Sequence, residues 1–157
     1  MIVQQAYQKA AAMCSKSEKC SFDIRQKLQG WELNEDEIDA VIAELIREKF
    51  IDDGRYAAYF ARDKFRFNRW GKKKIEYQLR MKQIASAFIY DAFDEIADSD
   101  YEETAYELIV DKVRKTKAVN DWDMKSKVSR FMQGRGFESE LVLRLFDRVN
   151  EDIKKGE

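Results

Sequence analysis

The sequence predicts an all-α protein built from three tandem three-helix repeats of about fifty residues, stacked in an elongated, curved array. Two observations lead to this prediction. The 157-residue chain contains no proline and only six glycines, so few residues interrupt its helices. Apolar residues also recur in the same order at spacings of 51 and 53 residues. The expected repeats are 1–50, 51–98 and 99–153, followed by a frayed tail at 154–157.

When the three copies are aligned with one another, seven positions are apolar in every copy, and these seven columns define the repeat. In the first copy they are Ile24, Leu28, Leu33, Ile38, Val41, Ile42 and Leu45. The second copy has Ile75, Leu79, Ile84, Ile89, Ala92, Phe93 and Ile96, and the third has Val128, Met132, Phe137, Val142, Leu145, Phe146 and Val149. The first two columns have i,i+4 spacing, and the last four follow i,i+3,i+4,i+7. Each copy therefore contains two amphipathic helices joined by a short turn.

The turns and helix starts also carry signals. The turn of the first copy contains Gly30, and that of the third contains Gly134 and Gly136. Glycine suits a helix C-terminus because it enters the left-handed conformation without penalty. Met81 takes the matching place in the second copy, which predicts a different turn there. The second helices are expected to begin at the N-cap residues Asn34, Ser86 and Ser139.

A leading helix precedes each pair. These helices are expected at about 3–13, 55–67 and 102–115, and they align less well between copies than the pairs do. Asp52 and Asp53 stand where the middle one needs an N-cap. Because so small a unit cannot bury its apolar face alone, neighbouring copies should stack.

Composition excludes several function classes. No apolar run approaches the length of a membrane span, and the N-terminus does not read as a signal peptide, so we expect a cytoplasmic protein with no membrane partner. Cys14 and Cys20 should then stay reduced. With no histidine and two cysteines, a zinc site is not expected, and no glycine-rich phosphate loop is present. We expect no catalytic residues, no metal, no cofactor and no enzymatic activity.

Charge is segregated along the chain, although the net charge is only −1. Segment 62–82 nets +7 and includes four aromatic residues, a composition typical of surfaces that bind a phosphate backbone. The alternative is a solvated helix face whose aromatic rings point into the core. The expected binding residues are Lys64, Arg66, Arg69, Lys72, Lys73, Lys74, Arg80, Lys82, Lys127, Arg130 and Arg135. Segment 91–111 holds nine acidic residues and no basic one, so it is either solvated or faces a basic protein surface.

Three stretches resemble the RecX family of bacterial recombination regulators. Residues 50–57 read Phe-Ile-Asp-Asp-Gly-Arg-Tyr-Ala, similar to the family signature. Gly71, the following lysines and Ile84 resemble a second motif, and residues 135–137, Arg-Gly-Phe, resemble the C-terminal repeat. Signature residues expected to be structural or capping are Asp52, Asp53, Arg55, Tyr56 and Gly71. Gln83 replaces a family glycine, which predicts another turn geometry there.

The resemblance implies a non-enzymatic, monomeric regulator of the RecA recombinase in recombination, DNA repair and the SOS response. Such a protein binds RecA and RecA–DNA filaments and inhibits ATP hydrolysis, strand exchange and co-protease action. Weak, non-specific contact with single- and double-stranded DNA is expected from the basic residues, and the acidic segment is the candidate for protein contact. Two other readings remain open: a helix-turn-helix transcriptional regulator, since paired helices with a tight turn are typical of that class, and a plain helical scaffold.

Overall fold

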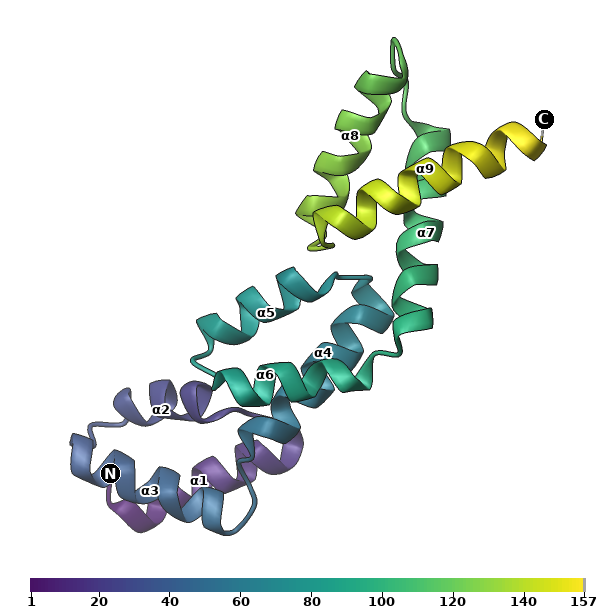
Figure 1. The fold of residues 1–157 in the computed structure, drawn as a ribbon. Helices are drawn as coiled ribbons and strands as arrows, with labels where there is room; N and C mark the ends of the chain where they lie inside the picture. The colour runs from purple at the N-terminus through teal and green to yellow at the C-terminus, as the bar shows by residue number, and fades with distance from the viewer. Residues whose placement is uncertain (157) are drawn as a thin grey trace. The chain divides into compact units, whose positions relative to one another are not determined.

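The computed structural model describes residues 1–156, which form nine α-helices, one short 3₁₀ helix and no strand (Figure 1). The first copy contains α1 (Val3–Lys16), α2 (Ser21–Gln29) and α3 (Glu35–Arg47). The second contains α4 (Asp53–Asn68), α5 (Lys72–Met81) and α6 (Ser86–Ala92), followed by the 3₁₀ helix η1 (Phe93–Glu95). The third contains α7 (Asp98–Lys115), α8 (Asp121–Gly134) and α9 (Ser139–Gly156). The predicted all-α class with three three-helix groups is confirmed.

The leading helices are longer than the periodicity predicted. α1 continues to Lys16, α4 begins at Asp53 and α7 begins at Asp98. At the other end of the chain, α9 runs to Gly156, so helical backbone extends past the expected boundary at 153. Glu157, the last residue of the expected tail, lies outside the described residues.

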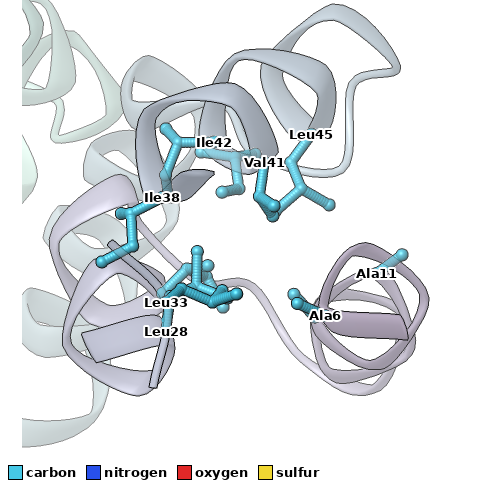
Figure 2. Close-up of a cluster of buried hydrophobic side chains, with 11 residues drawn as sticks. Ala6, Ala11, Leu28, Leu33, Ile38, Val41, Ile42 and Leu45 are labelled. Carbon is cyan, nitrogen blue, oxygen red and sulfur yellow. The ribbon is translucent and has the colours of Figure 1, made fainter. Parts of the chain in front are cut away.

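The apolar columns form the cores. Every column residue is buried except Phe93, which is partly buried. In the first copy, Leu28 and Leu33 point toward Val41 and Leu45 of α3, and Ala6 faces them from α1 (Figure 2). Alanines on the buried face of α1 let that helix pack against α3, which also packs against α2. The seven columns predicted from spacing are therefore core positions.

The turn inside each copy is made by a left-handed residue, at Glu32 (φ 63°), Gln83 (φ 57°) and Gly136 (φ 95°). These three residues occupy one column of the repeat. The prediction that Gly30 supplies the left-handed residue is wrong, since its φ is −76°. The expectation of a different geometry at Gln83 is also wrong.

The hydrogen bonds around these turns explain why the copies share a left-handed residue at this position. The N–H of Ile84 donates to the carbonyl of Leu79 at 3.1 Å, and that of Phe137 donates to the carbonyl of Met132 at 3.1 Å. These bonds satisfy carbonyls at the helix end and require a left-handed residue just before the donor. The apolar residue after the turn is buried, so its burial outweighs the cost of about 1 kcal/mol that a non-glycine residue adds at this position.

One of the three predicted N-caps is confirmed. The side chain of Asn34 accepts a hydrogen bond from the N–H of Glu37 at 2.8 Å, and the Glu37 carboxylate accepts from the N–H of Asn34 at 3.0 Å. This reciprocal pair satisfies two N–H groups at the start of α3.

Ser86 and Ser139 stand one residue inside their helices rather than at the caps. The first helical hydrogen bonds end on the carbonyls of Ala85 and Glu138, which are the residues at the cap positions. The two serine hydroxyls accept side-chain hydrogen bonds from the preceding helix instead, at 3.0 Å from Arg80 and 3.3 Å from Gln133. The predicted cap positions are therefore wrong by one residue. Each serine hydroxyl accepts from the preceding helix instead of capping its own helix.

The chain divides into two compact units that do not follow the repeats. One unit comprises Met1–Phe60 and Leu79–Ala92, and the other comprises Ala61–Gln78 and the residues from Phe93 onward. Helices α4 and α5 contribute residues to both, so the second copy has no unit of its own. Within the second unit, α7, α8 and α9 pack pairwise. The repeat boundaries stay predictions.

Candidate nucleic-acid interface

The signature residues of 50–57 build a polar junction in the first unit. The N–H of Arg55 donates to the side chain of Asp52 at 3.0 Å, and the N–H of Tyr56 donates to its carbonyl at 2.9 Å, so Asp52 is the N-cap of α4. Asp53 accepts from the N–H of Ser21 at 2.8 Å and from its hydroxyl at 2.9 Å. Ser21 is the first residue of α2, so Asp53 joins the starts of two helices from neighbouring copies.

The Arg55 side chain completes this junction. Its Nε donates to Glu18 at 2.8 Å, and its guanidinium also donates to the carbonyl of Lys49 at 3.2 Å. Tyr56 stacks on Phe60 with ring centroids 6.0 Å apart, and burial raises the pKa of its hydroxyl. All of these contacts lie inside the first unit, where they stabilise the fold.

A counterpart junction lies in the second unit, at the start of α5. The N–H of Lys72, the first residue of α5, donates to the Tyr101 hydroxyl at 2.9 Å, and that hydroxyl donates to Glu138 at 2.6 Å. The N–H of Gly71 donates to the carbonyl of Arg135 at 2.7 Å, and that of Lys73 to the carbonyl of Gly136 at 3.0 Å. These N–H groups are thus occupied by protein oxygens and do not offer a phosphate site at the helix N-terminus.

Tyr101 is buried at the centre of this second junction. Its ring lies 5.1 Å from that of Phe137 and 5.8 Å from that of Phe65. Burial, followed by the hydrogen bond to Glu138, raises the pKa of its hydroxyl, so the phenol stays protonated and can donate. Tyr101 was not predicted from the sequence, because it belongs to a leading helix, and those helices align poorly between copies.

Two of the predicted binding cations are used inside the protein. The Lys72 ammonium lies 3.9 Å from Asp98 and 4.7 Å above the centre of the Tyr101 ring. The Arg135 guanidinium donates to the carbonyls of Asn68 and Arg69, at 3.3 Å in the second case. Both side chains support the start of α5, which reduces their availability to a ligand.

The remaining predicted cations fall into three groups. Lys82 and Arg80 lie in the first unit, where Lys82 pairs with Asp23 at 2.5 Å and Arg80 donates to Tyr90 at 3.0 Å. On α8, Lys127 lies 3.1 Å from Asp123 and donates to the carbonyl of Lys117 at 2.9 Å, while Arg130 is exposed. The third group is the α4–α5 basic cluster of the second unit, which comprises Lys64, Arg66, Arg69, Lys73 and Lys74.

The α4–α5 basic cluster presents its cations in different ways. The ammonium groups of Lys64 and Lys74 lie 5.0 and 4.7 Å from the centre of the Trp70 ring, which holds both near one indole. Arg66 and Lys73 are exposed, and neither forms an ion pair or side-chain hydrogen bond with any residue of 1–156. Within the cluster, Arg66 and Lys73 therefore offer unneutralised positive charge, while Lys64 and Lys74 lie against an aromatic ring.

A groove of about 320 Å³ borders this cluster. Arg62, Arg66 and Arg69 line it from the α4 side, whereas acidic residues line it from η1 and α7; these are Glu95, Asp100, Glu103 and Glu107. Arg69 lies 3.9 Å from Glu107 across it. The groove has both signs of charge, so a polyanion is repelled by one of its walls.

The described part of the chain holds neither a metal-binding cluster nor a helix suited to span a membrane. Residues 1–156 contain no group of three or more His, Cys, Asp or Glu side chains arranged to hold a metal ion. None of the described helices combines the length and apolar character that a bilayer crossing requires.

Three family models match the chain, in the order of its repeats. The first three-helix domain of RecX matches residues 6–45, the second matches 52–92 and the third matches 99–146. Among solved structures, RecX from Lactobacillus salivarius superimposes with a TM-score of 0.86 at 20% identity, covering 94% of this chain and 96% of that one. A crystal structure of regulatory protein RecX gives a TM-score of 0.84 at 24% identity, covering 92% and 73%.

Curated relatives carry the same name. Regulatory protein RecX of Acinetobacter baylyi is 29% identical over 91% of this chain and 87% of its own length. Those of Clostridium beijerinckii and Lactobacillus gasseri are 27% and 21% identical, and the alignments cover 66% and 55% of their lengths. Since the three domain models together match most of the chain and follow its repeats in order, this protein belongs to the RecX family of regulatory proteins.

Proposed function

We propose that this protein binds RecA and RecA–DNA filaments and inhibits the activities of the recombinase without catalysing a reaction. The observation that carries the proposal is the match of three RecX domains over the chain. The motifs at 50–57 and 71–84 support it, because they resemble those of a family that modulates RecA. The inhibited activities are ATP hydrolysis, strand exchange and co-protease action, and the site of action is the cytoplasm.

The α4–α5 basic cluster supports a second element of the proposal, which is weak and non-specific contact with DNA. Arg66 and Lys73 are exposed and unpaired within 1–156, so they suit phosphate oxygens better than the cations used in the junctions. Such contacts carry no base information, so they favour a filament modulator over a regulator that reads one operator.

The decisive experiment measures ATP hydrolysis by RecA on single-stranded DNA while the purified full-length chain is titrated in. The expected result is a progressive fall of the rate as the protein approaches the concentration of the filament. An unchanged rate at several-fold excess over the filament would reject the proposal.

A gel-shift series addresses the transcription-factor alternative. The protein is mixed with several unrelated duplexes at one fixed salt concentration. We expect affinities within about tenfold of one another, whereas a true operator-binding protein prefers its site by roughly a thousandfold or more.

A further inference from the structure

The surface of the second unit carries exposed aromatic rings among its unpaired cations. Tyr77 on α5 is 62% exposed, and Phe67 near the end of α4 is 74% exposed. Neither makes a side-chain hydrogen bond or ring contact with the described residues. Single exposed apolar residues need no explanation, but rings placed beside free cations have the composition of surfaces that hold single-stranded nucleic acid.

Tyr77 has the clearer setting of the two. It lies four residues after Lys73 on α5, so the two side chains are neighbours on one face of the helix. Both are exposed, and Lys73 has no ion-pair partner within residues 1–156. A phosphate on the Lys73 ammonium would place the attached nucleotide beside the ring of Tyr77.

Trp70 differs from Tyr77, although it belongs to the same stretch. It is partly buried, and two lysine ammonium groups already lie within about 5 Å of its ring centre. The indole therefore organises cations, while the phenol ring of Tyr77 is the one whose face is available for stacking.

The charges around α5 also indicate where a single strand of nucleic acid could bind. The groove beside α4 has an acidic wall formed by residues of η1 and α7, which repels phosphate. No residue of α5 lines that groove, so Lys73 and Tyr77 lie outside it. A strand bound there follows α5 rather than the groove.

We propose that Tyr77 is a base-stacking platform and that the surface formed by Tyr77, Lys73 and Lys74 binds single-stranded nucleic acid in preference to duplex. The inference rests on the proposed contact with DNA and sharpens it to one class of ligand. In a duplex the base faces are covered by their neighbours, so only the phosphate contacts remain available. In a single strand the same phosphates are contacted and a base face is free to stack.

The test measures fluorescence anisotropy of a labelled oligothymidylate and of a labelled mixed-sequence duplex, with the full-length protein at several salt concentrations. Tyr77→Ala is expected to weaken single-strand binding about 5- to 100-fold and to leave duplex binding within about twofold. Tyr77→Phe keeps the aromatic face and is expected to bind like the wild type. Lys73→Ala is expected to weaken both ligands and to lower the salt slope by about 0.7 for the single strand, whereas Tyr77→Ala leaves that slope unchanged.

Trp122→Ala is the matched control. Trp122 is an aromatic residue of the same unit with 77% of its surface exposed, but it lies between Asp121 and Asp123. Its removal is expected to change neither affinity. The inference is overturned if the wild type does not bind the oligothymidylate, if Tyr77→Ala binds like the wild type, or if Tyr77→Ala and Trp122→Ala lose affinity equally.

The RecA experiment separates this inference from the proposed function. A wild type that leaves RecA hydrolysis unchanged but binds the oligothymidylate through Tyr77 removes the proposed function and retains the stacking site. If instead the wild type inhibits RecA and Tyr77→Ala binds DNA normally, the stacking site is rejected and the proposed function is retained.

Discussion

Gly71 and Gly136 approach each other so closely that neither position has room for a side chain. A Cβ atom on Gly71 would lie 2.3 Å from the carbonyl carbon and oxygen of Gly136, and one on Gly136 would lie 2.4 Å from the Cβ of Lys74. The contact joins the start of α5 to the turn between α8 and α9. The second unit therefore depends on glycine at two places far apart in the sequence.

We predict that Gly71→Ala lowers the free energy of unfolding by about 1–3 kcal/mol, because the new methyl group overlaps backbone atoms that cannot rotate away. Urea denaturation followed by circular dichroism measures the change. Gly134→Ala is the matched control, since a Cβ there meets nothing within 4 Å. This control should be neutral or stabilising by up to about 1 kcal/mol, and equal losses in both variants would contradict the packing argument.

Replacing Gln83 with glycine should stabilise the protein. The residue adopts a φ of 57°, which costs a non-glycine side chain about 1 kcal/mol, although glycine adds entropy to the unfolded chain. We expect Gln83→Gly to gain about 0.5 kcal/mol, measured as a higher midpoint of urea unfolding. A clear loss of stability would show that the Gln83 side chain contributes more than its backbone strain costs.

The stability of the first unit should depend on the negative charge of the Asp53 carboxylate. Asp53→Asn keeps the shape of the side chain but replaces a carboxylate that accepts from both the N–H and the hydroxyl of Ser21. We expect a loss of about 1–3 kcal/mol, because the amide group retains only one acceptor oxygen. The Ser21→Ala variant should lose less, since its N–H still donates, and the reverse ranking in thermal unfolding would reject this account.

Charge reversal at Lys72 should mainly lower stability, whereas charge reversal at Lys73 should mainly weaken DNA binding. Lys72→Glu places a carboxylate beside Asp98 and the Tyr101 ring, so it is expected to destabilise the fold by about 1 kcal/mol. Lys73→Glu is expected to leave the melting temperature unchanged and to weaken DNA binding with a smaller salt dependence. Melting curves and anisotropy titrations of the two variants check both expectations, and a destabilised Lys73→Glu would contradict the assignment of that side chain to solvent.

Alkaline pH should destabilise the folded chain. Burial raises the pKa of the Cys20 thiol from 9.0 to about 11, so the folded state keeps a proton that the unfolded chain releases. Stability from this group is complete below about pH 9 and is lost as the pH rises toward 11, by at most about 1.4 kcal/mol per pH unit. Urea unfolding at pH 8 and pH 10.5 should show a smaller loss in Cys20→Ala than in the wild type, and parallel losses in the two proteins would refute this role of the thiol.

The candidate site was only partly predictable. Sequence alone grouped the basic residues by their position along the chain, yet the structure divides them between two units and uses Lys72 and Arg135 in internal contacts. Tyr101, which accepts from the N–H of Lys72, could not be found from the repeat. The hydrogen-bond partner of a helix start lies in another copy, and no local pattern encodes that pairing.

The sequence by itself determined the helices, the three copies and their buried columns, because burial on one face of a helix leaves a local period of 3.6 residues. It also identified Asn34 as a cap and narrowed the cap of α4 to Asp52 or Asp53, of which Asp52 is the cap, since capping acts over three residues. Only the tertiary structure decided that Gln83 adopts the same left-handed conformation as Glu32 and Gly136, and that Lys72 is held by Asp98 and Tyr101 while Lys73 faces solvent. Adjacent residues on a helix point about 100° apart, so the elements packed around α5 determine which lysine is free.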